Sequence, residues 1–160
     1  MSTTTIDQKT VNGIATRILH EGYGEGAWHG PDLKAALADV TPEQAYSRPG
    51  PGRHNIAEIA VHHAYTVHGV RAKLGSDVER FPLAGEDWFE VSNSTTLPWS
   101  KILGMVAFEH EKLEATLRDA DGRGGSSQSD PERFDLVLGI TCHAVYHAGQ
   151  IQLIKRLAKA

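Results

Sequence analysis

Apolar residues recur at helical spacing in four long stretches of the chain, and each stretch predicts an amphipathic helix. These stretches span roughly residues 6–20, 55–75, 97–120 and 130–159. No stretch alternates convincingly between apolar and polar positions, as a half-buried strand would. The pattern therefore predicts an all-α fold, in which four helices form a bundle with long crossings between them.

Capping signals mark where some of these helices begin. Asn55 is a good N-cap residue, and Glu58 three positions later completes a capping-box pair at the start of the second long helix. Asp130 marks the start of the fourth. A shorter helix is predicted over residues 31–37, with Pro31 in its first turn, where proline is tolerated.

Two connections between the helices stand out. Residues 76–96 show no periodicity and predict a long irregular segment that contains Phe81, Trp88 and Phe89. A structureless connection of this length is uncommon in a compact domain and often carries function. Trp88 is better explained as a core anchor, although a tryptophan here could line a pocket. Residues 122–129 are rich in glycine and serine and predict a flexible loop.

Length and composition narrow the class of protein. A chain of 160 residues fits one domain, residues 1–160, with a core large enough to need no disulfide. A net charge of −4 argues against a nucleic-acid-binding protein that uses a basic face. No apolar run is long enough to span a membrane, and the N-terminus lacks the pattern of a secretory signal. With a single cysteine, the chain fits the reducing cytoplasm.

His143 and His147 carry the most definite chemistry in the sequence. They are four residues apart in a predicted helix, so they point the same way from successive turns about 5.4 Å apart. They share an apolar stripe with Ile140, Ile151 and Ile154, so their ring nitrogens need partners. A lone histidine would be explained as a satisfied core or rim residue. Two on one stripe would repel each other when charged, and a shared cation removes that repulsion.

A third ligand would have to come from another helix, and the adjacent His62 and His63 offer one. These two point about 100° apart around their helix, so they cannot face one site equally well. His63 lies on the apolar stripe of the helix, whereas His62 lies at its edge, one turn after Glu58. Spacing leaves both open, and the edge position favours His62. Glu58 could orient the His62 ring through a hydrogen bond, in addition to its capping role.

Other polar residues near the pair have less definite roles. Gln150 shares the face of His147 and could bond that ligand. Cys142 projects about 100° away from His143 and is better explained as a small buried apolar residue. His110 lies within the apolar stripe of the third helix and is explained as a satisfied core or rim histidine.

Two segments of the chain together resemble the DinB/YfiT-like superfamily. They are residues 55–62, Asn-Ile-Ala-Glu-Ile-Ala-Val-His, and residues 143–151, His-Ala-Val-Tyr-His-Ala-Gly-Gln-Ile. The stretch 27–33, Ala-Trp-His-Gly-Pro-Asp-Leu, followed by Leu37, resembles one branch of it. The similarity extends over most of the chain, from about Ile6 to Leu157, with the motifs in the same order.

The resemblance implies a fold, a cofactor and a ligand set. The family fold is an up-down four-helix bundle, often a homodimer. Three histidines bind a divalent metal, usually zinc or nickel, with water at the open positions. One comes from the second helix and two, four residues apart, from the last. The corresponding residues here are His62, His143 and His147, so the resemblance selects His62 over His63.

The resemblance also implies an activity. Family members of known activity include thiol S-transferases and isomerases that use bacillithiol, mycothiol or glutathione. We therefore expect a metal-dependent enzyme that transfers a low-molecular-weight thiol to an electrophilic small molecule, because a thiol bound to the metal would be a nucleophile at neutral pH. Two alternatives keep the metal: a hydrolase that activates water, and a non-catalytic, stress-associated protein whose site a fourth protein ligand closes. A helical interaction module would bind no metal.

Overall fold

The computed structural model describes residues 11–75, 78–119 and 130–158, and every regular element within these residues is an α-helix. The helices are α1 (Val11–Gly22), α2 (Leu33–Ala38), α3 (Pro42–Tyr46), α4 (Ile56–Leu74), α5 (Trp99–Asp119) and α6 (Asp130–Leu157). The predicted all-α fold is confirmed. The predicted beginning of the first helix before residue 11, the loop 122–129 and the last residues of the fourth helix lie outside the described residues.

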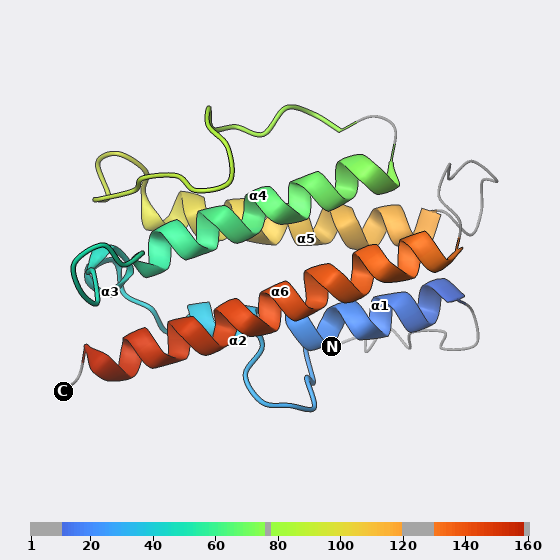
Figure 1. Ribbon diagram of the computed structural model, residues 1–160, viewed down its shortest axis with the longest axis horizontal. Helices are drawn as coiled ribbons and strands as arrows, with labels where there is room; N and C mark the ends of the chain where they lie inside the picture. The colour runs from blue at the N-terminus through green and yellow to red at the C-terminus, as the bar shows by residue number, and fades with distance from the viewer. Residues whose placement is uncertain (1–10, 76–77, 120–129, 159–160) are drawn as a thin grey trace.

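The four long helices form the bundle. Helix α6 packs against α1 and α4, and α5 packs against the same two helices, so the order around the bundle is α1, α6, α4, α5. Figure 1 shows that α4 and α5 run in one direction and α1 and α6 in the other. Two long crossings produce this order: residues 23–55, which contain α2 and α3, and residues 75–98. No described helix has the length and apolar character that crossing a membrane requires.

Side chains that accept hydrogen bonds from the first backbone N–H groups determine where these helices begin. At α4, Asn55 Oδ1 accepts a hydrogen bond from the backbone N–H of Glu58 at 2.8 Å, and the Glu58 carboxylate accepts one from Asn55 N–H at 3.4 Å. The predicted capping box is confirmed. The prediction that a helix begins at Pro31 is wrong, because the Asp32 carboxylate accepts from Ala35 N–H at 2.8 Å and makes Asp32 the N-cap.

The core consists of two apolar clusters stacked along the bundle. One is built on α2, the first half of α4 and α5 and the second half of α6, and the other on α1 and the remaining halves. Three histidines lie where α4, α5 and α6 pass from one cluster to the other: His63, His110 and His143. The bundle therefore carries a polar layer across its middle.

Residues 78–96 have no regular structure, as predicted, and three buried side chains, Phe81, Phe89 and Val91, attach them to the bundle. Phe81 and Phe89 are buried, and each lies edge-on to Tyr65 of α4 at a ring-centroid distance of about 5 Å. The backbone at Val91 is anchored to the start of α4, because its carbonyl accepts from Asn55 Nδ2 at 2.8 Å. These contacts fix the part of the connection between Phe81 and Val91 over the first half of α4.

Candidate metal centre

Three histidine side chains from two antiparallel helices converge at one point. Nε2 of His143 lies 3.1 Å from Nε2 of His62 and 3.2 Å from Nε2 of His147. All three ligand atoms lie within 4.8 Å of one another, and within the described part of the chain this is the one group of histidine, cysteine and acidic side chains arranged to hold a metal ion. The structure therefore brings together the three residues that the sequence predicted.

The opposite nitrogens of two of these rings are held by oxygen acceptors. His62 Nδ1 lies 2.9 Å from the backbone carbonyl oxygen of Asp87, and His147 Nδ1 lies 2.6 Å from Oε1 of Gln150. A carbonyl oxygen only accepts, so each Nδ1 carries the proton and donates it. In a neutral imidazole the other nitrogen then presents a lone pair. The Nε2 lone pairs of His62 and His147 therefore point into the group.

Burial favours the neutral form of the His143 and His147 rings. Loss of hydration, aided by the neighbouring His147 and His62 rings, lowers the pKa of His143 to about 4. Burial also lowers the pKa of His147, and the hydrogen bond to Gln150 offsets part of that change. Neutral imidazole is the form that ligates a metal. The site is thus poised to bind a cation near neutral pH.

A divalent cation fits this donor set. At metal–nitrogen distances of 2.0–2.1 Å, ligand nitrogens in a tetrahedral zinc site lie about 3.3 Å apart. The two Nε2 separations at His143 are close to that value. Lone pairs packed this closely repel one another unless a proton or a cation lies between them. The three histidines would therefore hold the ion, as imidazole donors do for zinc, copper, iron and nickel.

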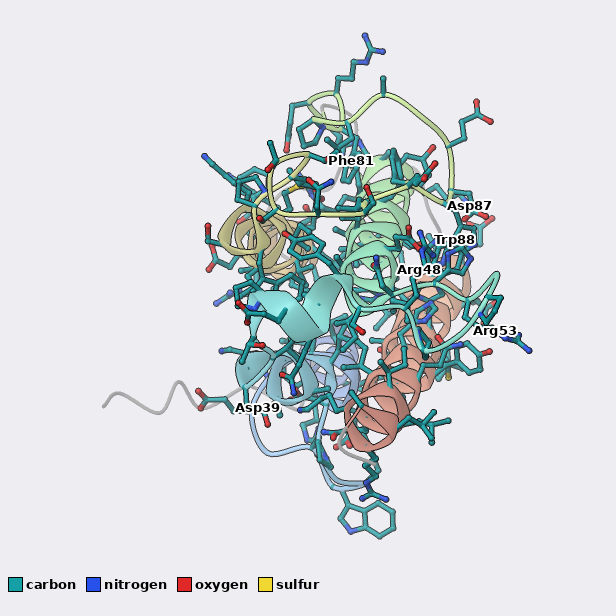
Figure 2. The ribbon with its side chains drawn as sticks, turned by 90° about the vertical axis from the view of Figure 1, so that its left-hand side faces the viewer. Asp39, Arg48, Arg53, Phe81, Asp87 and Trp88 are labelled. Carbon is teal, nitrogen blue, oxygen red and sulfur yellow. The ribbon has the colours of Figure 1, made fainter. Side chains whose placement is uncertain are left out.

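Aromatic rings cover one side of the group. Trp88 stacks on His62 with ring centroids 4.0 Å apart and planes 4° from parallel, and on its other face it stacks on His54 at 3.7 Å. Figure 2 shows Asp87 and Trp88 together at the outer edge of the bundle, on the long connection. Asp87 has a left-handed backbone conformation, φ 60°, which aspartate tolerates better than most residues. This turn presents the Asp87 carbonyl and the Trp88 ring to the same histidine.

The sequence matches a known family. A family model described as the DinB superfamily matches residues 27–151, which is most of the chain and includes all three histidines. The chain belongs to the DinB superfamily. The resemblance drawn from the histidine motifs is thus confirmed. No curated protein and no solved structure matches the chain.

In this member of the DinB superfamily, Glu58 does not orient the His62 ring, a role that the sequence left open. Its carboxylate accepts from the Arg48 guanidinium, from the backbone of Val91 and from Asn55 in the capping box, and it contacts His54 Nδ1. These bonds outweigh the burial of the carboxylate and hold its pKa below the usual value. The carboxylate next to His62 Nδ1 is instead that of Asp87, at 3.1 Å.

Sequence reasoning missed Asp87 and undervalued Trp88, His63 and His110. Trp88 was expected to be a core anchor, but its ring is 36 % exposed and covers the site. Its position in a long connection was the available signal. Cys142 was expected to be buried, and that is wrong: it is exposed, because its position on α6 points away from the bundle. It lies next to His143 in sequence but on another face of the helix.

Replacing Trp88 by alanine should weaken zinc binding about 2- to 10-fold, because one stacked pair is worth about 0.5–1.5 kcal/mol beyond its buried area. The loss arises from a His62 ring that is no longer held in one orientation. Competition with a coloured chelator would measure it. Trp28→Ala is the control, since Trp28 is 90 % exposed and should leave affinity unchanged. Equal affinity in both variants would show that the stack does not support the site.

Proposed function

We propose that the protein is a metal-dependent enzyme that transfers a low-molecular-weight thiol to an electrophilic small molecule at the group His62, His143 and His147. The observation that carries the proposal is the convergence of the three Nε2 atoms, two of them in rings whose Nδ1 protons are already engaged. Membership of the DinB superfamily supports the proposal, because thiol transfer is one of the activities that the resemblance to this family implies.

The donor set supports a catalytic site over a closed structural one. Three neutral imidazoles leave the charge of a divalent ion uncompensated, and three protein ligands leave a coordination position free, as in catalytic zinc sites. The two residues that could have closed the site within the described chain are engaged elsewhere. Glu58 binds Arg48, and His63 turns its Nε2 to His110 at 2.8 Å. A divalent ion held by these histidines would lower the pKa of a thiol beside it and so supply the nucleophile.

The side chains around the group suit a small, partly apolar substrate. Trp88 and His54 form a stacked aromatic wall next to His62, and both are part-exposed. Tyr146 lies beside His147, with its ring 5.3 Å from that of His147 and its hydroxyl 3.3 Å from Gln150 Nε2. An electrophile could lie against this wall, with the Tyr146 hydroxyl available for a polar group.

In the proposed reaction a sulfur–carbon bond replaces a bond to a leaving group. The thiol gives its proton to solvent, its sulfur attacks the electrophilic carbon, and chloride departs with the bonding electron pair from a chlorinated substrate. With an epoxide, the ring oxygen takes the electron pair and a proton from water. No redox partner is needed in either case.

The test is thiol conjugation by zinc-loaded and nickel-loaded protein. Glutathione, cysteine, bacillithiol and mycothiol would each be combined with a chlorinated aromatic compound and with an epoxide, and products identified by mass spectrometry. We expect a conjugate whose formation requires the metal and is lost in His62→Ala. Arg53→Ala, on the loop before α4, provides a variant outside the histidine group.

The possible products separate the alternatives. A conjugate formed only with thiol and metal supports the proposal. A hydroxylated product formed without thiol would replace it by the hydrolase. Metal bound with no product from any pair would overturn thiol transfer and favour the non-catalytic metal-binding protein.

A further inference from the structure

A line of imidazole rings leads from the candidate metal centre into the core. His143 uses Nε2 towards the centre, and its Nδ1 lies 3.0 Å from Nδ1 of His63. Nε2 of His63 lies 2.8 Å from Nε2 of His110 on α5. His63 is fully buried and His110 almost so, and His110 stacks on Tyr23 with ring centroids 4.0 Å apart. The proposed ligands do not account for either buried ring.

Each of the two contacts joins ring nitrogens 2.8–3.0 Å apart, a hydrogen-bond distance that requires one proton between them. Burial lowers the pKa of His110 to about 3 and so favours its neutral form. A neutral imidazole carries one proton, so each ring donates at one nitrogen and accepts at the other. The line can therefore run in only two directions, and choosing the protonated nitrogen of one ring fixes those of the other two.

The two directions have opposite consequences for the site. If protons point from His110 towards His143, Nε2 of His143 carries a proton that occupies the space between the other two ligands. If they point from His143 towards His110, Nδ1 of His143 donates to His63, Nε2 of His63 donates to His110, and Nε2 of His143 is left as a lone pair. Only the second direction presents three lone pairs to one point.

We infer that His63 and His110 are positioning residues, which hold His143 in the tautomer and orientation that expose its Nε2 to the metal. The inference rests on the metal site of the proposed function. His63, backed by His110, accepts the Nδ1 proton of His143. The Asp87 carbonyl accepts that of His62 in the same way, and Gln150 accepts that of His147. Groups that bond the outer nitrogen of a ligating histidine commonly contribute 10- to 100-fold to metal affinity. Each of the three ligands thus has a partner at Nδ1.

His110, at the far end of this line of rings, has an unsatisfied nitrogen, which is energetically unfavourable. Nδ1 of His110 is buried and has no hydrogen-bond partner among the described residues. In the direction that permits metal binding, this nitrogen carries the proton. An unpaired buried N–H is unfavourable, so packing alone would not select it. Metal binding at the other end supplies a reason for it.

Nitrogen-15 NMR of the zinc-loaded protein tests the direction. We expect protons at Nδ1 of His143, Nε2 of His63 and Nδ1 of His110, and a scalar coupling across the bond from His143 to His63. Finding the His110 proton at Nε2 would overturn the inference while leaving the metal site intact. If the wild-type protein binds neither zinc nor nickel, the proposed metal site and its positioning chain fail together.

Two variants of His63 separate positioning from packing. His63→Leu fills most of the space but has no acceptor, and we expect its zinc dissociation constant to rise about 10- to 100-fold. His63→Asn leaves a cavity but places an amide oxygen near the position of Nδ1, where it can accept from His143. We expect the His63→Asn variant to retain zinc more tightly than the leucine variant, although it is the less well packed protein.

A purely structural His63 predicts the reverse order, with affinity following the thermal stability of the two variants. His68→Leu is the matched control, because His68 lies on the same helix but contacts Glu109 and Phe81, outside the chain of rings. It should bind zinc as the wild type does. Loss of affinity in His68→Leu equal to that in His63→Leu would overturn the inference.

Discussion

Replacing His143 by alanine should abolish stoichiometric metal binding. Its Nε2 is the atom that lies between those of His62 and His147, at 3.1 and 3.2 Å, so its removal leaves two donors with nothing to join them. The affinity should fall by more than about 100-fold, the upper end of what losing a partner outside the ligand set costs. Elemental analysis of protein purified without a histidine tag would measure the loss.

Cys142→Ala is the matched control for this experiment. Cys142 precedes His143 on the same helix and is itself a metal-binding residue type, but it is exposed and outside the histidine group. The cysteine variant should carry as much metal as the wild type. Full occupancy in His143→Ala, or loss of metal in Cys142→Ala, would place the ion elsewhere.

Helical geometry made part of this site predictable. Two histidines four residues apart on an α-helix must share a face, whatever surrounds them, so His143 and His147 could be paired from spacing. Which neighbour completes the group could not be settled in the same way. His62 and His63 point about 100° apart, and the structure uses both, on opposite nitrogens of the same His143 ring. The spacing of residues along α4 does not show that the His143 ring is contacted by both histidines, one at each of its nitrogens.

The supporting residues depend on the path of an irregular segment. Asp87 reaches His62 because residues 78–96 pack on α4 through Phe81 and Phe89 and turn at a left-handed residue. Neither periodicity nor capping signals specify such a path. In contrast, the start of α4 follows from local chemistry, since Asn55 and Glu58 satisfy the first N–H groups wherever the helix lies. The fold could therefore be predicted where the signal is local, as at the start of α4. The site could be predicted where its residues repeat at helical spacing, as at His143 and His147.

Glu58 illustrates this division within a single residue. As a capping-box residue it was predictable, because the partner is three positions away. Its bonds to Arg48 and to the backbone of Val91 join three separate segments and exclude it from the metal group. A buried carboxylate is bonded by whichever donors the tertiary fold brings to it, and those come from remote parts of the chain.

Acid should destabilise the metal-free protein more steeply than it destabilises His110→Phe. Burial lowers the pKa of His110 to about 3 in the native state, whereas the unfolded chain titrates near the ordinary value of 6.5. Below pH 6.5 the unfolded state therefore binds a proton that the native state does not. The stability from a neutral His110 is complete above pH 6.5 and is lost as the pH falls towards 3. Between pH 7 and 5 this one group removes about 2 kcal/mol.

Urea unfolding of the metal-free proteins at pH 7, 6 and 5 would measure the difference. The groups that face His110 are His63, Tyr23 and, at longer range, His20, and none of them supplies a negative charge that could retain the proton near neutral pH. Removing the imidazole should reduce the slope of unfolding free energy against pH by about 1 kcal/mol per unit, averaged over this range. Parallel slopes for wild type and His110→Phe would mean that the native core accepts a proton at His110, which would also remove the basis for a neutral chain of rings behind the metal site.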